Sequence, residues 1–215
     1  MGHTRRRTPS GEVEQALLGA AFHLLEAEGP EALSVRRVAA EAGVAPMGVY
    51  NHFDGKNGVV DALFRTGFEA LTEEIADLEQ ADDPVEAFKE GLRRYRRLAL
   101  DHPRTYEVMF LKSVEGFEPS EASMEVATAS FDGLARKVGR AIEAGEFAAA
   151  DERELAQVAW AACHGVVALE IAGICMVDDL ATTYEQLLDT LVEGFSAPPG
   201  RAGSRAPAAR PARAR

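Results

Sequence analysis

Apolar residues recur at helical spacing along most of the chain, beginning near its amino end. The first run ends at Gly29 and Pro30. Its apolar positions follow the spacing i, i+3, i+4, i+7, which is typical of an amphipathic helix that buries one face. These positions are Val13, Ala16, Leu17, Ala20, Ala21, Leu24 and Leu25. The pattern therefore predicts a first helix that stops before residue 29.

Two shorter helices separated by a glycine are predicted over residues 34–53. Ser34 is a candidate N-cap for the first, because its hydroxyl can accept a hydrogen bond from the opening turn. Gly43 falls where the turn requires a positive φ, and Pro46 falls in the first turn of the second helix. The two apolar faces consist of Val35, Val38, Ala39 and Ala42, and of Val49 and Phe53. This layout is a helix-turn-helix, whose second helix can enter the major groove of DNA.

Helical stripes continue as far as residue 195, and no strand-like alternation rises above them. A fourth helix is expected from Lys56, with Asp54 as its cap, and a further helix from residue 85 ends before Pro103. Other helices are expected around residues 106–110, after the candidate caps Ser120 and Asp151, and over residues 184–195. The predicted fold class is therefore all-α.

The excess of acidic side chains lies outside the helix-turn-helix. The chain of 215 residues has a net charge of −12. Residues 1–66 carry 7 basic and 8 acidic side chains, residues 67–196 carry 11 and 27, and residues 197–215 carry 5 and 0. An acidic body repels the duplex and favours one orientation on it. The charge distribution permits DNA binding but does not by itself argue for it.

Three groups of residues around the predicted turn keep a fixed register, namely Ala42-Gly43-Val44, Val49-Tyr50-Asn51-His52-Phe53 and Lys56. In that register they resemble the N-terminal signature of the TetR family of transcriptional regulators, within a match over roughly residues 12–64. The resemblance implies an all-helical homodimer that binds a near-palindromic double-stranded DNA operator. It also implies release of that operator when a small-molecule effector fills the C-terminal domain. Met47, Gly48 and Asn51 depart from the residues common in the family.

A second resemblance lies near the carboxyl end. Trp160-Ala-Ala-Cys-His164-Gly165 is similar to the Trp…His-Gly motif in the C-terminal domain of one TetR subfamily. It implies that residues 151–176 and 180–195 of two subunits form a four-helix dimer interface.

The expected organisation is a flexible basic arm (1–10), a helix-turn-helix DNA-binding domain (11–66), a helical effector-binding and dimerisation domain (67–196) and a disordered Arg/Pro/Ala tail (197–215).

The candidate DNA-binding residues surround the predicted second helix of the motif. They are Ser34, Arg36, Arg37, Ala45, Pro46, Met47, Gly48, Tyr50, Asn51, His52 and Lys56. Tyr50, Asn51 and Met47 are expected at base edges, since Asn pairs with adenine and Met lies against a thymine methyl. His52, the two arginines and Lys56 are expected at the sugar-phosphate backbone. For the two arginines the alternative is a solvated face. For Gly48 the alternatives are close approach of the backbone to phosphate and a tolerated helix defect. The arm Arg5–Arg7 either contacts the minor groove or is a solubilising terminus.

The candidate effector-binding residues are aromatic or polarisable side chains on several helices. They are Phe88, Tyr95, Tyr106, Met109, Phe110, Met124, Phe131, Trp160 and His164. Such a lining suits an apolar or aromatic ligand, although the same helical spacing is compatible with a plain core. For His164 the alternative is a core histidine with satisfied hydrogen bonds. The run Arg93, Arg94, Arg96 and Arg97 is either a solvated face or a capture site for an anionic effector.

Several function classes are excluded or disfavoured by what the chain contains. On one helix Cys163 and Cys175 would lie about 18 Å apart, which is too far for a disulfide bond between them. They therefore predict buried thiols of a reducing cytoplasm, with a redox sensor or an intersubunit bridge as the alternative. The apolar stretch Val158–Val177 contains His164 and Glu170 and has acidic flanks, which favours a buried helix over a membrane span.

The expected function is a cytoplasmic, ligand-responsive DNA-binding regulator, most simply a homodimeric repressor that an apolar or aromatic effector releases from its operator. No catalytic motif, metal-ligand spacing or cofactor signature accompanies the helical pattern. Two alternatives remain open at this point. One is a helical adaptor without specific DNA affinity, and the other is a small enzyme.

Overall fold

The computed structural model describes residues 10–196 of the chain. These residues form α-helices joined by loops and two short 3-10 turns, and no strand occurs among them, which confirms the all-α class. The helices are α1 (Ser10–Glu28), α2 (Val35–Glu41), α3 (Pro46–Phe53), α4 (Lys56–Glu74), α5 (Pro84–Asp101), α6 (Pro103–Phe110), α7 (Glu121–Glu143), α8 (Glu152–Ile171) and α9 (Leu180–Ser196), and the 3-10 turns are η1 (Pro30–Ala32) and η2 (Ala76–Gln80). The expected basic arm and the Arg/Pro/Ala tail lie outside the described residues, apart from residue 10.

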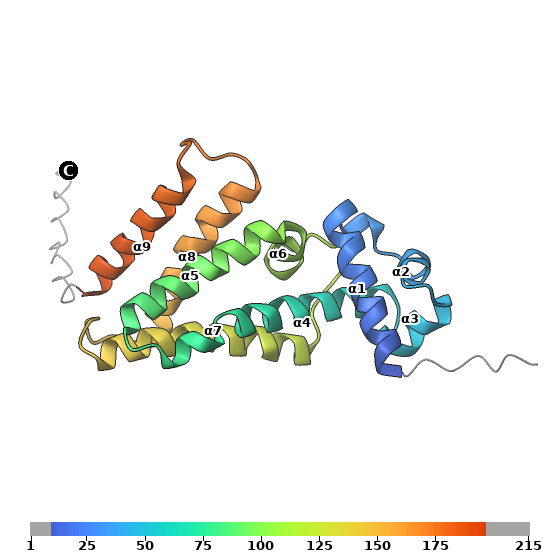
Figure 1. Ribbon diagram of the computed structural model, residues 1–215, viewed down its shortest axis with the longest axis horizontal. Coiled ribbons are helices and arrows are strands. Elements are labelled where there is room, and N and C mark those ends of the chain that lie inside the picture. The colour runs from blue at the N-terminus through green and yellow to red at the C-terminus, as the bar shows by residue number, and fades with distance from the viewer. Residues whose placement is uncertain (1–9, 197–215) are drawn as a thin grey trace, which may run out of the picture.

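The helices are distributed along one long axis of the molecule (Figure 1). At one end α1, α2 and α3 gather around the start of α4, and α8 and α9 lie at the opposite end. α4 packs against α1 and α3 and also against α6 and α7. A single helix therefore contributes to both halves of the structure.

The first hydrophobic core lies among α1, α2, α3 and α4. Its members include Leu17, Leu25, Leu33, Val38, Val49, Phe53, Val60 and Leu63. The same core also takes in Val108 and Met109 of α6, together with Val114 and Phe117 of the loop that follows. The helix-turn-helix module thus shares its core with a segment that is distant in sequence.

The second core lies among α5, α7, α8 and α9. Phe88, Phe147 and Phe195 pack edge to face within it, with ring centroids 5.5 Å and 5.4 Å apart along that series. α8 buries Ala159, Cys163 and Val167 in this core, while Val158, Gly165 and Leu169 on its opposite side are exposed. Within one subunit α8 thus packs against α5, α7 and α9 and leaves the opposite side uncovered, so burial on most sides stays a prediction for the assembled protein.

Three of the predicted N-caps are confirmed. Ser34 accepts a hydrogen bond from the backbone N–H of Arg37 at 3.3 Å and begins α2. Ser120 begins α7 in the same way, and Asp151 accepts two backbone N–H bonds, at 2.9 Å and 3.0 Å, at the start of α8. These caps could be predicted because each one joins residues that are two or three positions apart.

The predicted cap at Asp54 is wrong. Asp54 closes α3 in the left-handed conformation, with φ of 53°, and Gly55 begins α4 with φ of 92° and no side-chain cap. Only two residues separate the helices, so the chain must reverse sharply and the backbone of Asp54 is used for the turn. Gly43, by contrast, has the expected positive φ of 68° between α2 and α3.

Candidate functional site

α3 presents an exposed face that no other helix of the described chain covers. Val49 is fully buried and Phe53 is 8% exposed, so these two side chains attach α3 to the first core. Met47 is 64% exposed and Tyr50 is 55% exposed. The exposed positions of the helix and its N-cap are Ala45, Pro46, Met47, Tyr50 and Asn51. A short helix held from behind and open in front has the form that a major groove can accept.

Gly48 lies on the side of α3 that faces the preceding turn. A Cβ at this position would meet Val44 at 3.5 Å and Leu17 at 3.9 Å, which are ordinary packing distances. Steric packing inside the chain therefore does not require glycine here. The missing Cβ points toward Val44 and Leu17 of the same chain, which favours the alternative of a tolerated helix defect.

The basic residues near α3 differ in how they are paired. Arg37 forms an ion pair with Glu28 of α1 at 2.5 Å, and this contact raises the pKa of Arg37. His52 keeps only 14% of its side chain exposed and lies 3.7 Å from Glu14 of α1. Arg36 and Lys56 are exposed and have no carboxylate partner within residues 10–196. These two cations are therefore the best placed to meet phosphates, whereas Arg37 would first have to leave Glu28.

A cavity of ≈ 660 Å³ opens among α4, α5, α6, α7, α8 and the loop after α6. The volume falls within the range of about 300–1,000 Å³ that is usual for small-molecule sites. Six of the candidate effector residues line it, namely Tyr95, Met109, Phe110, Met124, Phe131 and Trp160. Phe64 and Phe68 of α4 and Phe117 of the loop complete much of the aromatic wall. The cavity is thus bounded in part by residues of the first core.

Tyr106 and His164 lie outside the cavity lining, in a hydrogen-bonded group behind Tyr95. The Tyr95 hydroxyl donates to the Tyr106 oxygen at 3.3 Å, and the Tyr106 hydroxyl lies 2.6 Å from Nδ1 of His164. Burial lowers the pKa of His164, so its neutral form is favoured and Nδ1 can accept a hydrogen bond. The same burial raises the pKa of Tyr106 to about 12. This arrangement fits the alternative of a core histidine with satisfied hydrogen bonds.

Phe88 also lies outside the lining, since it packs with Phe147 and Phe195 in the second core. Conversely, Lys137 and Arg153 line the cavity and were not among the candidates. Lys137 is spaced three residues after Leu134 and four before Ala141, on the apolar stripe of α7. A charged residue in that register is a signal from which the sequence could have identified it. Burial lowers the pKa of Lys137, and the carboxylate of Glu79 opposes that shift.

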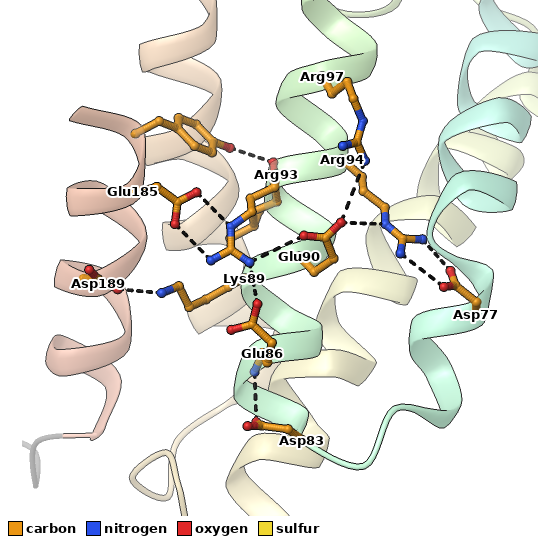
Figure 2. Close-up of polar contacts among 12 residues, drawn as sticks. Asp77, Asp83, Glu86, Lys89, Glu90, Arg93, Arg94, Arg97, Glu185 and Asp189 are labelled. Atoms are coloured by element: carbon orange, nitrogen blue, oxygen red, sulfur yellow. Dashed lines mark hydrogen bonds and ion pairs between the residues drawn. The ribbon is translucent and has the colours of Figure 1, made fainter. Parts of the chain in front are cut away.

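The arginines of α5 are engaged in ion pairs and are not part of the cavity lining. Figure 2 shows Arg93 held between Glu185 of α9 and the acidic side chains of its own helix, with a distance of 2.8 Å to Glu185. Arg94 contacts Asp77 of η2 at 2.5 Å, and Arg96 contacts the buried Glu170 of α8 at 2.7 Å. These side chains connect α5 to three neighbouring elements, which argues against capture of an anionic effector at this place.

Two family models match the chain across both of these regions. The model described as bacterial regulatory proteins, tetR family, matches residues 17–63, which contain the helix-turn-helix. The model described as tetracyclin repressor-like, C-terminal domain, matches residues 88–191, which contain most of the cavity wall. The chain belongs to the TetR family. Because this is a family of regulatory proteins, the small-enzyme alternative falls away.

Individual relatives of this TetR-family chain agree with that assignment. The HTH-type transcriptional repressor Rv3405c of Mycobacterium tuberculosis is 32% identical over 96 residues, which cover 44% of this chain and 49% of the relative. The chain therefore aligns with about half the length of its curated relatives.

Solved structures extend the likeness to the whole fold. A protein of unknown function from Rhodococcus sp. RHA1 has a TM-score of 0.78 and 27% identity, covering 91% of this chain and 100% of that chain. The TetR family transcriptional regulator PfmR from Thermus thermophilus has a TM-score of 0.64 and 17% identity, with coverage of 84% and 99%.

Two carboxylates of the helix-turn-helix module of this TetR-family chain hold a segment that lines the cavity. Glu26 of α1 accepts hydrogen bonds from the backbone N–H of Thr105 at 2.8 Å and from its hydroxyl at 2.6 Å, in the first turn of α6. Asp61 of α4 accepts from the backbone and hydroxyl of Ser120 at 2.8 Å and 2.9 Å, at the start of α7. The segment 103–123 is thus bound to the module near both of its ends.

Replacing Glu26 with alanine should lower the free energy of unfolding by about 1–2 kcal/mol, because the N–H and hydroxyl of the buried Thr105 lose their acceptor. Urea unfolding followed by circular dichroism measures the change. Gln15→Ala on the exposed face of α1 is the control, expected within about 0.5 kcal/mol of the parent chain. Equal stabilities of the two variants would contradict the role given to Glu26.

The outer side of α8 and the loop to α9 carry exposed apolar side chains. These are Val158, Leu169, Ile174, Met176 and Val177. Gly165 lies on the same side, and a Cβ placed there would meet nothing within 4 Å in the chain. Exposed apolar area of this kind is a common mark of an interaction surface.

The cysteines and other candidate sites add no chemistry to this picture. Cys163 is buried, which raises the pKa of its thiol to about 11, and Cys175 lies half-buried in the loop before α9. Within residues 10–196 no cluster of His, Cys, Asp and Glu side chains is suited to hold a metal ion. No described helix is both long and apolar enough to span a bilayer.

Proposed function

We propose that this chain is a homodimeric, ligand-responsive repressor that binds a near-palindromic DNA operator through α3. The observation that carries the proposal is the exposed face of α3, fixed to its core by Val49 and Phe53, in a chain whose cavity shares α4 with the same module. The name of the mycobacterial relative, an HTH-type transcriptional repressor, supports repression. This function places the protein in the cytoplasm, with the chromosomal DNA.

Base reading is assigned to Asn51, Tyr50 and Met47. An Asn side chain can pair with two atoms of adenine at once, and a Met side chain can cover a thymine methyl. Arg36 and Lys56 supply contacts to phosphates, which fix the position of the helix without selecting sequence. Ser34 supports this set indirectly, because it fixes the start of α2.

The dimer is assigned to the outer sides of α8 and α9. The exposed apolar residues of α8 and of the loop to α9 would be covered by the same surface of a second subunit, as in a two-fold symmetric contact. Gly165 and the neighbouring Ala161, both exposed, allow the two copies of α8 to approach closely. A two-fold dimer presents two copies of α3, so its operator has matching half-sites.

The effector is assigned to the ≈ 660 Å³ cavity. Met109 of α6 and Phe117 of the following loop belong both to its lining and to the first core. A ligand that displaces these side chains acts directly on the core that holds α3. Adjacent major-groove faces repeat about every 34–36 Å, so a small change in the separation of the two recognition helices weakens operator binding.

Selection of bound fragments from random duplex DNA tests the proposal, with the full chain as bait. Recovery of a near-palindromic motif supports it. Enrichment of no motif, or binding that depends on salt alone with no sequence preference, would instead indicate an adaptor without specific DNA affinity. Sedimentation of the free protein as a monomer would contradict the dimer.

Tyr50→Ala and Asn51→Ala should each lower the ratio of specific to non-specific DNA affinity by about 10- to 100-fold, since a good base contact is worth about 1–3 kcal/mol. Lys56→Ala should weaken specific and random duplexes alike and reduce the dependence of affinity on salt. Fluorescence anisotropy at several salt concentrations measures all three. A Lys56→Ala protein with an unchanged salt dependence would contradict the phosphate contact.

A further inference from the structure

Lys137 is a charged side chain with no exposed surface, and it reaches the cavity from α7. Burying an ammonium group is strongly unfavourable unless it is paired and hydrogen-bonded. Its aliphatic part lies against α5, where a Cβ on Gly91 would be 3.6 Å and 3.7 Å from Cδ and Cε of the lysine. The aliphatic part of Lys137 is therefore packed, and this packing fixes the position of the ammonium group.

The pairing of Lys137 inside the chain is incomplete. Its Nζ donates one hydrogen bond, to Glu79 at 3.2 Å, among the described residues, although an ammonium group has three donors. The same carboxylate also accepts a hydrogen bond from Arg136 at 3.4 Å. Arg140, one turn further along α7, donates to the backbone carbonyls of Leu78 and Ala81. Lys137 and Arg136 thus share one carboxylate, and Arg140 has backbone carbonyls as its partners, which leaves positive charge in excess.

The other cations of the lining are differently placed. Arg153 pairs with Asp132 and lies over the Phe131 ring at 5.2 Å, and Lys112 is largely exposed and lies 3.8 Å from Glu118. Lys137 is the fully buried cation of the lining among the described residues. Much of the remaining wall is aromatic or aliphatic.

We propose that the cavity binds an apolar carboxylic acid whose carboxylate pairs with Lys137, an inference that rests on the proposed effector site and names the ligand class. A carboxylate can occupy the free donors of the ammonium group in charge-assisted hydrogen bonds. Its single negative charge offsets the excess that Glu79 leaves among the cations of α7. The apolar body of the acid fills the part of the cavity near Phe68, Phe110 and Trp160.

The fluorescence of Trp160 reports on this binding directly, because it is the chain's only tryptophan and lines the cavity. The probes are decanoic acid, 2-naphthoic acid and the methyl ester of each, titrated into the full chain without DNA. At least one acid should bind about tenfold or more tightly than its ester, because the hydrogen bonds to charged groups are lost in the ester. Equal affinities of acid and ester, or no response to either acid, would overturn the proposal.

Lys137→Met should abolish the preference for the acid and leave ester binding unchanged, since methionine has a similar length and no charge. Lys89→Met, at a lysine outside the lining that pairs with Asp189, is the control and should keep the preference. Lys137→Gln removes the charge with a polar side chain and gives a second variant if the first does not fold. Retention of the acid preference in a folded Lys137 variant refutes the anchor.

Release of operator DNA by the same acid is measured in a separate titration. Acid binding that depends on Lys137 but does not affect DNA would uphold the ligand class and contradict the regulatory role of the cavity. Sequence-specific DNA binding by a chain that binds neither acid would uphold the proposed DNA-binding function and contradict the ligand class.

Discussion

Replacing Gly58 with alanine is expected to unfold the helix-turn-helix module and to abolish specific DNA binding. Gly58 lies in the first turn of α4, and a Cβ at this position falls on the backbone carbonyl of Phe53, the last residue of α3. The obstacle is backbone, so no side-chain rotation relieves it. Moving α4 away would remove Val59 and Val60 from the first core, and the expected cost is about 3 kcal/mol or more.

Gly19→Ala is the matched control for this prediction. Gly19 lies on the exposed face of α1 in the same module, and a Cβ there meets nothing within 4 Å. Alanine in a helix interior should stabilise the chain by about 0.5–1 kcal/mol relative to glycine. Thermal unfolding and anisotropy with operator DNA measure both variants. A Gly58→Ala protein that melts and binds like the parent would show that α3 and α4 do not pack as described.

Replacing Gly165 with leucine is expected to convert the proposed dimer into a folded monomer and to lower operator affinity by about 100-fold or more, because two half-sites are then no longer bound together. Within the single chain Gly165 has open space above it, so the added side chain does not disturb the fold. Between two copies of α8 it would overpack the contact. The prediction therefore separates assembly from folding.

Analytical ultracentrifugation and circular dichroism, performed together, measure this effect. Gly19→Leu places the same side chain on an exposed helix outside the proposed interface, and it should remain a dimer. A Gly165→Leu protein that sediments as a full-strength dimer would place the interface elsewhere on the surface.

Short-range features of the structure were predictable from the sequence. The stripe of α1, the positive φ at Gly43 and the caps at Ser34 and Ser120 all follow from residues within about one helical turn. Asp54 shows where this reasoning ends. Aspartate is a common N-cap residue, but the connection between α3 and α4 is short and uses the backbone of Asp54 to reverse the direction of the chain.

Periodicity identifies which face of a helix is buried, but it does not distinguish a face that meets a packed core from one that lines a cavity. Tyr106 and Phe131 both fall on apolar stripes, yet the first lies in a hydrogen-bonded group and the second lines the cavity. Lys137 is a charged residue on the apolar stripe of α7. Its position in the sequence predicts a buried charge, but it does not show whether that charge faces a packed core or a cavity.

The sequence by itself determined the all-helical class, the helix-turn-helix and the TetR relationship, because these depend on local spacing and on a motif with a fixed register. Only the tertiary structure decided that Glu26 holds Thr105, 79 positions away, and that the arginines of α5 are occupied by acidic partners. It also decided which side chains surround the cavity. Such contacts depend on how helices cross, and helix crossing is set by the packing of the whole chain and not by any one segment.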